Sequence, residues 1–113
     1  MNVKLEKPII IRTTLKEALE TECLPYSGIY ILAYMNQILY VGKSSVSIND
    51  RLKSHLEPNS RTGVYLRRIE FDWDNIRLDI LEPPKCDNHD CWLMQAEMSL
   101  INQFKPLFNV QYV

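Results

Sequence analysis

The amino-acid sequence predicts a small α+β domain, and three observations support this prediction. Residues 27–34 and 38–42 are rich in isoleucine, leucine, valine and tyrosine and flank the polar pair Asn36-Gln37, as the strands of a β-hairpin do. Residues 76–81 alternate apolar and polar side chains, which is typical of a half-buried strand. Helical patterns lie before, between and after these strands. We therefore expect a small three-stranded antiparallel or mixed sheet flanked by helices.

Three helices are predicted before the last one. Residues 14–17 (TLKE) have the pattern of a capping box and predict a short helix over about residues 15–23. Residues 47–50 (SIND) resemble a second capping box, whose helix is expected to run to about Leu56. Residues 63–71 are interpreted as a further short helix.

The last helix, over residues 90–104, has the clearest pattern. Its apolar side chains recur at helical spacing, and Pro106 ends the run, because proline cannot continue a helix. These apolar residues are Leu93, Ala96, Leu100, Ile101 and Phe104.

The composition is that of an ordinary globular domain, with 113 residues, 46% of them hydrophobic and 24% charged. No run of about 18 apolar residues predicts a membrane-spanning helix, and the N-terminus lacks a secretory apolar region. Three cysteines form no evident disulfide framework. We therefore expect a single-domain, cytoplasmic protein.

The charge is unevenly distributed. A net charge of −1 argues against strong, sequence-indifferent binding to duplex DNA. Between Tyr40 and Arg68, however, six basic residues accompany two acidic ones, which gives this segment a net charge of +4. Such a segment suits a surface that faces phosphates, although a solvated helical face explains the same pattern.

Glu97 is the strongest candidate for chemistry in this sequence. At 100° per residue it falls inside the apolar stripe of the last helix, between Leu93 and Leu100. An ionised carboxylate that faces a core is costly unless it is paired or binds a metal. The alternatives are a buried ion pair with an arginine, or a side chain that tilts to the edge of the stripe.

The hairpin gives a second candidate pair. If its loop is the three residues 35–37, with Asn36 in a left-handed conformation, Tyr34 pairs with Ile38. Tyr30 and Tyr40 then lie on the same face of the sheet, whereas a two-residue loop would separate them. Tyrosine is also simply a common strand residue, so the pair alone does not indicate a site.

Arg51 and His55 are four residues apart and lie on one face of the predicted second helix, beside Ile48 and Leu52. Both side chains are therefore expected to point towards the domain. The alternatives are a partly buried, satisfied histidine and an arginine that serves only as a partner for Glu97.

Taken in order, these residues resemble the signature of the GIY-YIG nuclease family. The match runs through most of the chain and comprises Gly28-Ile29-Tyr30, Tyr40-Val41-Gly42, Lys43, Arg51, His55, Glu97 and Asn109. On this resemblance, residues 1–113 form one nuclease domain, with a motif region over residues 27–110 and an N-terminal helical extension over residues 1–26. The resemblance implies a three-stranded antiparallel sheet flanked by helices.

The resemblance also implies a role for each tyrosine and for two charged residues. Tyr40 matches the tyrosine that activates the attacking water, and Tyr30 matches one that shapes the site through hydrogen bonding. Arg51 matches the arginine that contacts the scissile phosphate. Glu97 matches the metal ligand, which holds Mg²⁺ or Mn²⁺.

The remaining matches are supporting positions. Lys43 and His55 correspond to residues that several members use to support catalysis. Asn109 closes the motif and, with Lys43 and Arg51, is assigned to the substrate-binding set. Two positions depart from the family pattern: Val41 replaces the isoleucine, and Asp50 stands where members often carry a basic residue, so one phosphate contact is expected to be missing.

The function predicted is a metal-dependent endonuclease that hydrolyses phosphodiester bonds by a one-metal mechanism, with DNA favoured over RNA. Tyr40 is the general base, and its usual pKa of about 10 must be lowered by nearby positive charge. The alternatives are a non-catalytic nucleic-acid-binding or regulatory module that retains the fold, and a subunit that serves assembly. Target specificity is expected to come from loops, from a homodimer or from a partner protein.

One cluster is not interpreted as a site. Residues 86–91 (CDNHDC) hold four potential metal ligands, but their spacing does not match that of structural zinc sites. We expect a polar cap that leads into the last helix.

Overall fold

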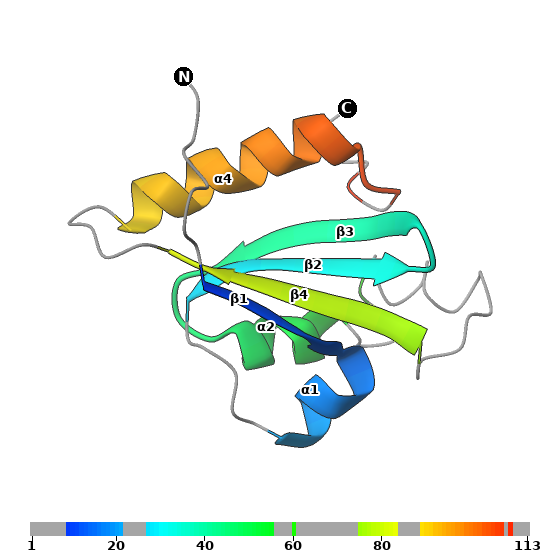
Figure 1. The fold of residues 1–113 in the computed structure, drawn as a ribbon. Coiled ribbons are helices and arrows are strands. Elements are labelled where there is room, and N and C mark those ends of the chain that lie inside the picture. Colours follow the sequence, from blue (N-terminus) through cyan, green and yellow to red (C-terminus); the bar gives the residue numbers. More distant parts are fainter. Residues whose placement is uncertain are drawn as a thin grey trace.

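Four antiparallel strands form one sheet, and the described helices cover both of its faces (Figure 1). The computed structural model describes residues 9–21, 27–55, 60, 75–83, 89–107 and 109. The elements are β1 (Ile9–Thr14), α1 (Leu15–Thr21), β2 (Gly28–Tyr34), β3 (Gln37–Ser44), α2 (Ile48–His55), β4 (Ile76–Glu82) and α4 (His89–Phe104). The strand order β1-β4-β2-β3 makes β1 and β3 the two edges of the sheet.

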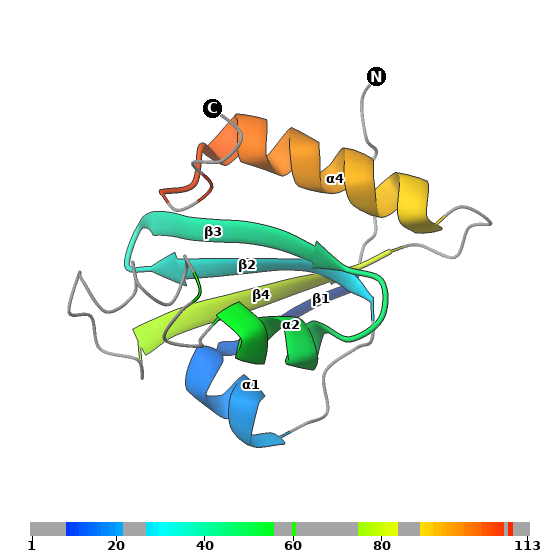
Figure 2. The same cartoon turned by 180° about the vertical axis from the view of Figure 1, so that it is seen from behind.

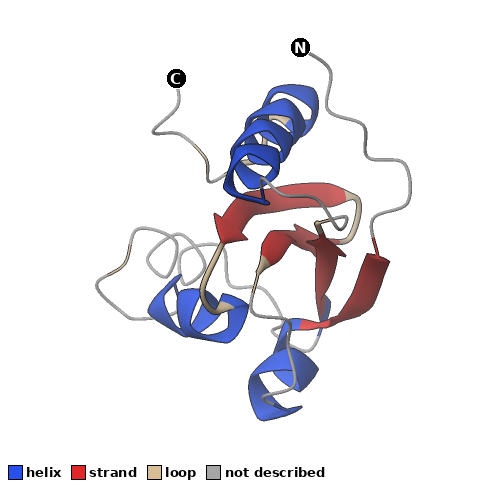
Figure 3. Ribbon diagram, turned by 90° about the vertical axis from the view of Figure 1, so that its left-hand side faces the viewer, coloured by secondary structure: helices blue, strands red, loops and turns tan. Residues whose placement is uncertain are grey.

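Each face of the sheet carries its own hydrophobic core. α1 and α2 lie against one face and α4 against the other, as Figures 2 and 3 show. The first core includes Tyr30, Leu32, Leu52, Leu78 and Ile80, and the second includes Ile29, Ile31, Val41, Leu93 and Leu100. Because β2 contributes to both cores, its side chains are buried on both faces, which explains its nearly continuous apolar sequence.

The hairpin between β2 and β3 differs from the prediction in two ways that cancel. Its loop has two residues, not three, since Tyr34 pairs with Gln37, and Met35, not Asn36, has the positive φ of 54°. A two-residue loop alone would separate the tyrosines. However, the register shifts between Leu32 and Ala33, whose partners are Tyr40 and Ile38. This β-bulge leaves one β3 residue, Leu39, without a partner and restores Tyr30 and Tyr40 to the same face.

The alternation of β3 is therefore reversed on the loop side of the bulge. Leu39 packs with the tyrosines in the first core, and Ile38 packs against the second. The predicted three-residue loop would instead place Ile38 on the face of the tyrosines and Leu39 on the other face. The shared face of the tyrosines is confirmed. The ring centroids of Tyr30 and Tyr40 lie 6.1 Å apart, with an angle of 29° between the ring planes.

The α+β class is confirmed, but the sheet has a fourth strand that the sequence analysis missed. Residues 9–14, expected to belong to a helical extension, form β1 and pair with β4. The β-branched run of this segment suits an edge strand. The pairing is reinforced on the α4 side of the sheet. The Arg12 side chain binds the carboxylate of Asp79 at 3.1 Å, and Arg77 lies 3.3 Å from the same carboxylate.

Both predicted capping residues begin their helices. The Thr14 hydroxyl accepts a hydrogen bond from the Glu17 N–H at 3.2 Å, and the Ser47 hydroxyl accepts one from the Asp50 N–H at 3.1 Å. The helix predicted over residues 63–71 lies outside the described residues. Among the helices that the structure describes, none is both long and apolar enough to cross a membrane.

Candidate active site

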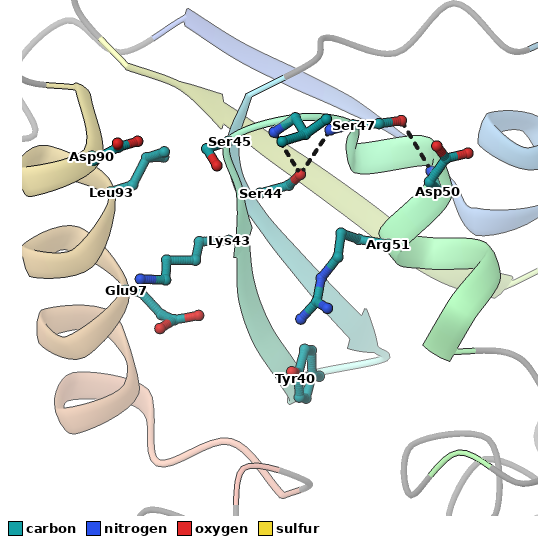
Figure 4. A pocket seen from close by; sticks show the side chains of 11 residues that line it. Tyr40, Lys43, Ser44, Ser45, Ser47, Asp50, Arg51, Asp90, Leu93 and Glu97 are labelled. Carbon is teal, nitrogen blue, oxygen red and sulfur yellow. Dashed lines mark hydrogen bonds between the residues drawn. The ribbon is translucent and has the colours of Figure 1, made fainter.

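A pocket of about 530 Å³ lies beside edge strand β3, between α2 and α4 (Figure 4). β3 supplies its back wall, α4 and α2 supply two facing walls, and the loop from β3 to α2 completes it. The lining residues are Tyr40, Lys43, Ser44, Ser45, Val46, Ser47, Asp50, Arg51, Asp90, Leu93 and Glu97. Four predicted site residues, from three different elements, therefore meet in one place.

Glu97 faces this pocket from α4, and its residue surface is only 8% exposed. Burial raises the pKa of its carboxyl, while the positive charges of Lys43 and Arg51 act in the opposite direction. Among the described residues, no side chain forms a hydrogen bond or a close ion pair with this carboxylate. The described residues therefore do not form the buried ion pair between Glu97 and an arginine that was the alternative interpretation.

The two tyrosines occupy different environments. Tyr40 lines the pocket, whereas Tyr30 is fully buried and stacks against Tyr40. Burial, together with negative charge on Tyr40, raises the pKa of the Tyr30 phenol well above its usual value of 10.0, and the nearby Arg51 guanidinium only partly offsets the rise. Tyr30 therefore keeps its proton at neutral pH, and its oxygen accepts a hydrogen bond from the Arg51 guanidinium.

Two glycines of the motif are explained by close contacts. A Cβ at Gly42 would lie 2.4 Å from the hydroxyl-bearing end of the Tyr30 ring, so only glycine leaves room for this ring. Gly28 has a φ of 157°, and a Cβ there would lie 2.7 Å from the backbone oxygen of Leu81. Glycine at position 42 therefore makes room for the Tyr30 ring, and glycine at position 28 allows β2 to lie close to the backbone of β4.

The loop that joins β3, which carries Lys43, to α2, which carries Arg51, is fixed by a serine that had not been predicted as a site residue. The hydroxyl of the buried Ser44 accepts hydrogen bonds from the N–H groups of Val46 and Ser47, at 3.3 and 3.0 Å. Such turns are common for serine, so the run Ser44-Ser45-Val46-Ser47 before a helix was a usable signal.

Asn109 lies on the free edge of β3, outside the pocket lining. Its side-chain carbonyl accepts a hydrogen bond from the Val41 N–H at 3.0 Å, and its amide donates one to the Val41 carbonyl at 2.9 Å. These two bonds continue the sheet by one residue and satisfy edge groups beside Tyr40 and Gly42.

Two predicted features are only partly described. His55 ends α2, but its side chain lies outside the described part of the chain, as do residues 86–88 of the cysteine-containing cluster and the side chain of His89. Cys91 is a free thiol on α4. Within the described residues, no group of three or more histidine, cysteine, aspartate or glutamate side chains is arranged to hold a metal ion. The described carboxylates that line the pocket are Asp50, Asp90 and Glu97, and only Glu97 is buried.

Comparison with known proteins places this geometry in a family. The family model described as the GIY-YIG catalytic domain matches residues 26–111. The solved structures include the N-terminal endonuclease domain of UvrC from Thermotoga maritima, bound to its catalytic divalent cation, magnesium. That domain is 19% identical to this chain, with a TM-score of 0.60 over 83% of this chain and 93% of the other.

A point mutant of the same UvrC domain, bound to its catalytic divalent cation, is 20% identical. It has a TM-score of 0.58 and covers 86% of this chain and 98% of its own. At this level of identity, both structures support the fold. The comparison with curated proteins found no match.

Proposed function

The chain belongs to the GIY-YIG family and is a nuclease, and on this premise we propose that it is a DNA endonuclease that uses one divalent cation held by Glu97. The observation that supports this proposal most is the meeting of four groups in one pocket. Tyr40, Lys43 and Arg51 line it together with the buried carboxylate of Glu97. The match to a catalytic domain favours this function over a non-catalytic binding module.

The residues present fit a magnesium ion. Glu97 is buried without a close cationic partner among the described residues, and a carboxylate in that state favours either a proton or a cation. Mg²⁺ keeps several of its waters and is commonly held by one or two carboxylates plus substrate phosphate. When bound, the ion would supply positive charge that stabilises phosphate oxygens during hydrolysis. A carboxylate on a helix, supported by a sheet, is also a rigid ligand.

Tyr40 is proposed as the base that takes a proton from the attacking water. Its hydroxyl faces the pocket beside the positively charged Lys43 and Arg51, and positive charge favours the phenolate. Tyr30 has the complementary property, because its proton is retained. The two stacked tyrosines thus have different proposed roles: Tyr40 loses its proton during the reaction, and Tyr30 keeps its proton.

Arg51 is proposed to bind the scissile phosphate. Its guanidinium offers several donors in a fixed plane, which matches the geometry of phosphate oxygens. The hydrogen bond shared with Tyr30 orients this side chain. Lys43 adds a second positive charge on the β3 wall. His55 remains a proposed supporting residue on the strength of its position in the motif.

For Asn109 we propose a positioning role in place of substrate contact. Both polar atoms of its side chain are bonded to Val41, and Asn109 is not among the residues that line the pocket. Tyr40 and Gly42 flank Val41 in β3. By binding the backbone of Val41, Asn109 fixes the position of these two neighbours.

The direct test is nuclease activity with and without metal. Purified protein is incubated with supercoiled plasmid, linear duplex, branched DNA and RNA, in Mg²⁺ or in EDTA. Cleavage of DNA that requires Mg²⁺ and disappears in Glu97→Ala is the expected result. Ser99→Ala, an exposed substitution on the same helix, is the matched control and retains activity. Cleavage by Glu97→Ala at the rate of the unaltered protein would remove Glu97 from the mechanism.

A further inference from the structure

Val46 is unusual among the residues that line the pocket. The other described apolar lining residues, Tyr40 and Leu93, are buried, whereas Val46 is 78% exposed. The rest of the lining is polar or charged. A single exposed valine on a surface needs no explanation by itself. Its place at the rim of a pocket that handles phosphate, in a loop of fixed conformation, is what makes it informative.

The loop presents Val46 rigidly. The N–H of Val46 is bonded to the buried hydroxyl of Ser44 at 3.3 Å, and the next residue, Ser47, begins α2 by accepting the Asp50 N–H. Only Ser45, Val46 and Ser47 separate β3 from α2. Because valine is branched at Cβ, its side chain also has one strongly restricted torsion. Val46 is therefore held at a defined position relative to Lys43 and Arg51.

A nucleic-acid backbone alternates charged phosphates with less polar sugars. If one phosphate sits among Tyr40, Lys43 and Arg51, the adjacent sugars lie at the rim of the pocket. An apolar rim residue is suited to the carbon face of a sugar and unsuited to a charged phosphate. The 2′-hydroxyl is the group that distinguishes RNA from DNA at such a contact.

We propose that Val46 packs against the sugar of a nucleotide adjacent to the cleaved bond and thereby favours deoxyribose over ribose at that position. This inference rests on the proposed nuclease function. Burying a 2′-hydroxyl against the valine methyl groups would remove water from it without offering a hydrogen-bond partner, which is unfavourable. Deoxyribose carries no such group.

The experiment compares a DNA duplex with matched duplexes that carry single ribonucleotides on either side of the cleavage site. Both kcat/KM in Mg²⁺ and Kd in Ca²⁺, measured by fluorescence anisotropy, are determined for each duplex. We expect the unaltered protein to disfavour one ribonucleotide position by roughly tenfold. Val46→Thr keeps the shape of the side chain and adds a hydroxyl. In this variant the ratio of kcat/KM for the DNA duplex to that for the ribonucleotide duplex, and the corresponding ratio of Kd values, should fall to less than about threefold.

Met35→Asn is the matched control. Met35 is also 78% exposed, and it lies at the other end of the eight-residue β3, at a positive φ that asparagine tolerates. Its ratio should equal that of the unaltered protein. Equal ratios in Val46→Thr and the unaltered protein, or no discrimination in either, overturn the inference. Binding without cleavage refutes the nuclease mechanism, while the Kd ratio still decides the role of Val46. Absence of any binding refutes both.

Discussion

The side-chain amide of Asn109 binds both backbone polar groups of Val41, with N–H to Oδ1 at 3.0 Å and Nδ2 to carbonyl at 2.9 Å. Asn109 is 68 residues away from Val41 in the sequence and is 5% exposed. It thus completes an edge strand that carries Tyr40, Gly42 and Lys43 towards the pocket. The position of Tyr40, the proposed base, is therefore expected to depend on a residue that does not line the pocket.

Removing this amide should loosen β3 and reduce activity. Asn109→Ala leaves two buried backbone groups of Val41 without partners, and each costs roughly 1–3 kcal/mol. We expect a lower Tm, together with a fall in kcat that exceeds any change in substrate affinity. Thermal unfolding and steady-state cleavage measure the two effects. Asn102→Ala, on the exposed side of α4, is the control and should leave both unchanged. An Asn109→Ala protein with unaltered stability would contradict the positioning role.

Gly42→Ala should displace Tyr30. The added Cβ would lie 2.4 Å from the Tyr30 ring, which is buried on all sides and has little room to move. Overpacking of this kind costs roughly 1–3 kcal/mol. The expected result is a lower Tm and a change in the near-ultraviolet circular dichroism of the tyrosines, with loss of cleavage. An alanine variant with the spectrum and activity of the unaltered protein would show that this contact is relieved at no cost.

Glu97→Gln should stabilise the metal-free protein at neutral pH. Burial raises the pKa of Glu97 in the folded state above its unfolded value of 4.5. Stability from the protonated carboxyl is therefore present below that value and is lost as the pH rises through the folded pKa. The neutral glutamine avoids this loss. In EDTA near pH 8, Glu97→Gln should therefore have a higher Tm than the unaltered protein, and the difference should vanish near pH 4.

Magnesium is expected to reverse this order. A cation that binds only the folded state stabilises it by about 2.7 kcal/mol at 100 times its Kd. Mg²⁺ should therefore raise the Tm of the unaltered protein and leave that of Glu97→Gln unchanged. A glutamine variant that is less stable than the unaltered protein in EDTA would mean that the carboxylate is compensated by groups other than a metal.

The two tyrosines should differ in their pH dependence. Tyr40→Phe removes the proposed base and should lower kcat by about 100-fold or more. Tyr30 keeps its proton because its pKa is raised by burial and by Tyr40. Tyr30→Phe should therefore lower the rate at every pH without changing the shape of the pH–rate profile. If the rising limb of the pH–rate profile disappears in Tyr30→Phe but remains in Tyr40→Phe, Tyr30 and not Tyr40 is the base.

Most helices and strands could be predicted because apolar spacing and capping residues are visible within a few consecutive residues. The apolar spacing of α4 placed Glu97 inside the stripe, and the structure buries it there. The capping serine of α2 was likewise visible in four residues. The tyrosine pair was predicted on one face, but from an incorrect loop length. A bulge at Leu39 compensates for the shorter loop, and a bulge depends on strand pairing that no short pattern encodes.

The missed features depend on contacts distant in the sequence. β1 is six residues long and joins the sheet only through β4, which lies more than 60 residues away. The two hydrogen bonds between Asn109 and Val41 likewise join residues that are 68 positions apart in the sequence. Motif resemblance identified Asn109, but only the fold shows what its amide binds. The sequence pattern thus predicted which residues matter better than what each of them contacts.

The most direct measurement is the location of a divalent cation in crystals of this protein soaked in Mn²⁺, recorded with anomalous scattering. The proposed mechanism predicts one strong anomalous peak at about 2.1 Å from a carboxylate oxygen of Glu97, on the pocket side of α4. It also predicts that the peak is missing in Glu97→Gln crystals. A peak bound elsewhere, with Glu97 ligating nothing, would contradict the central claim.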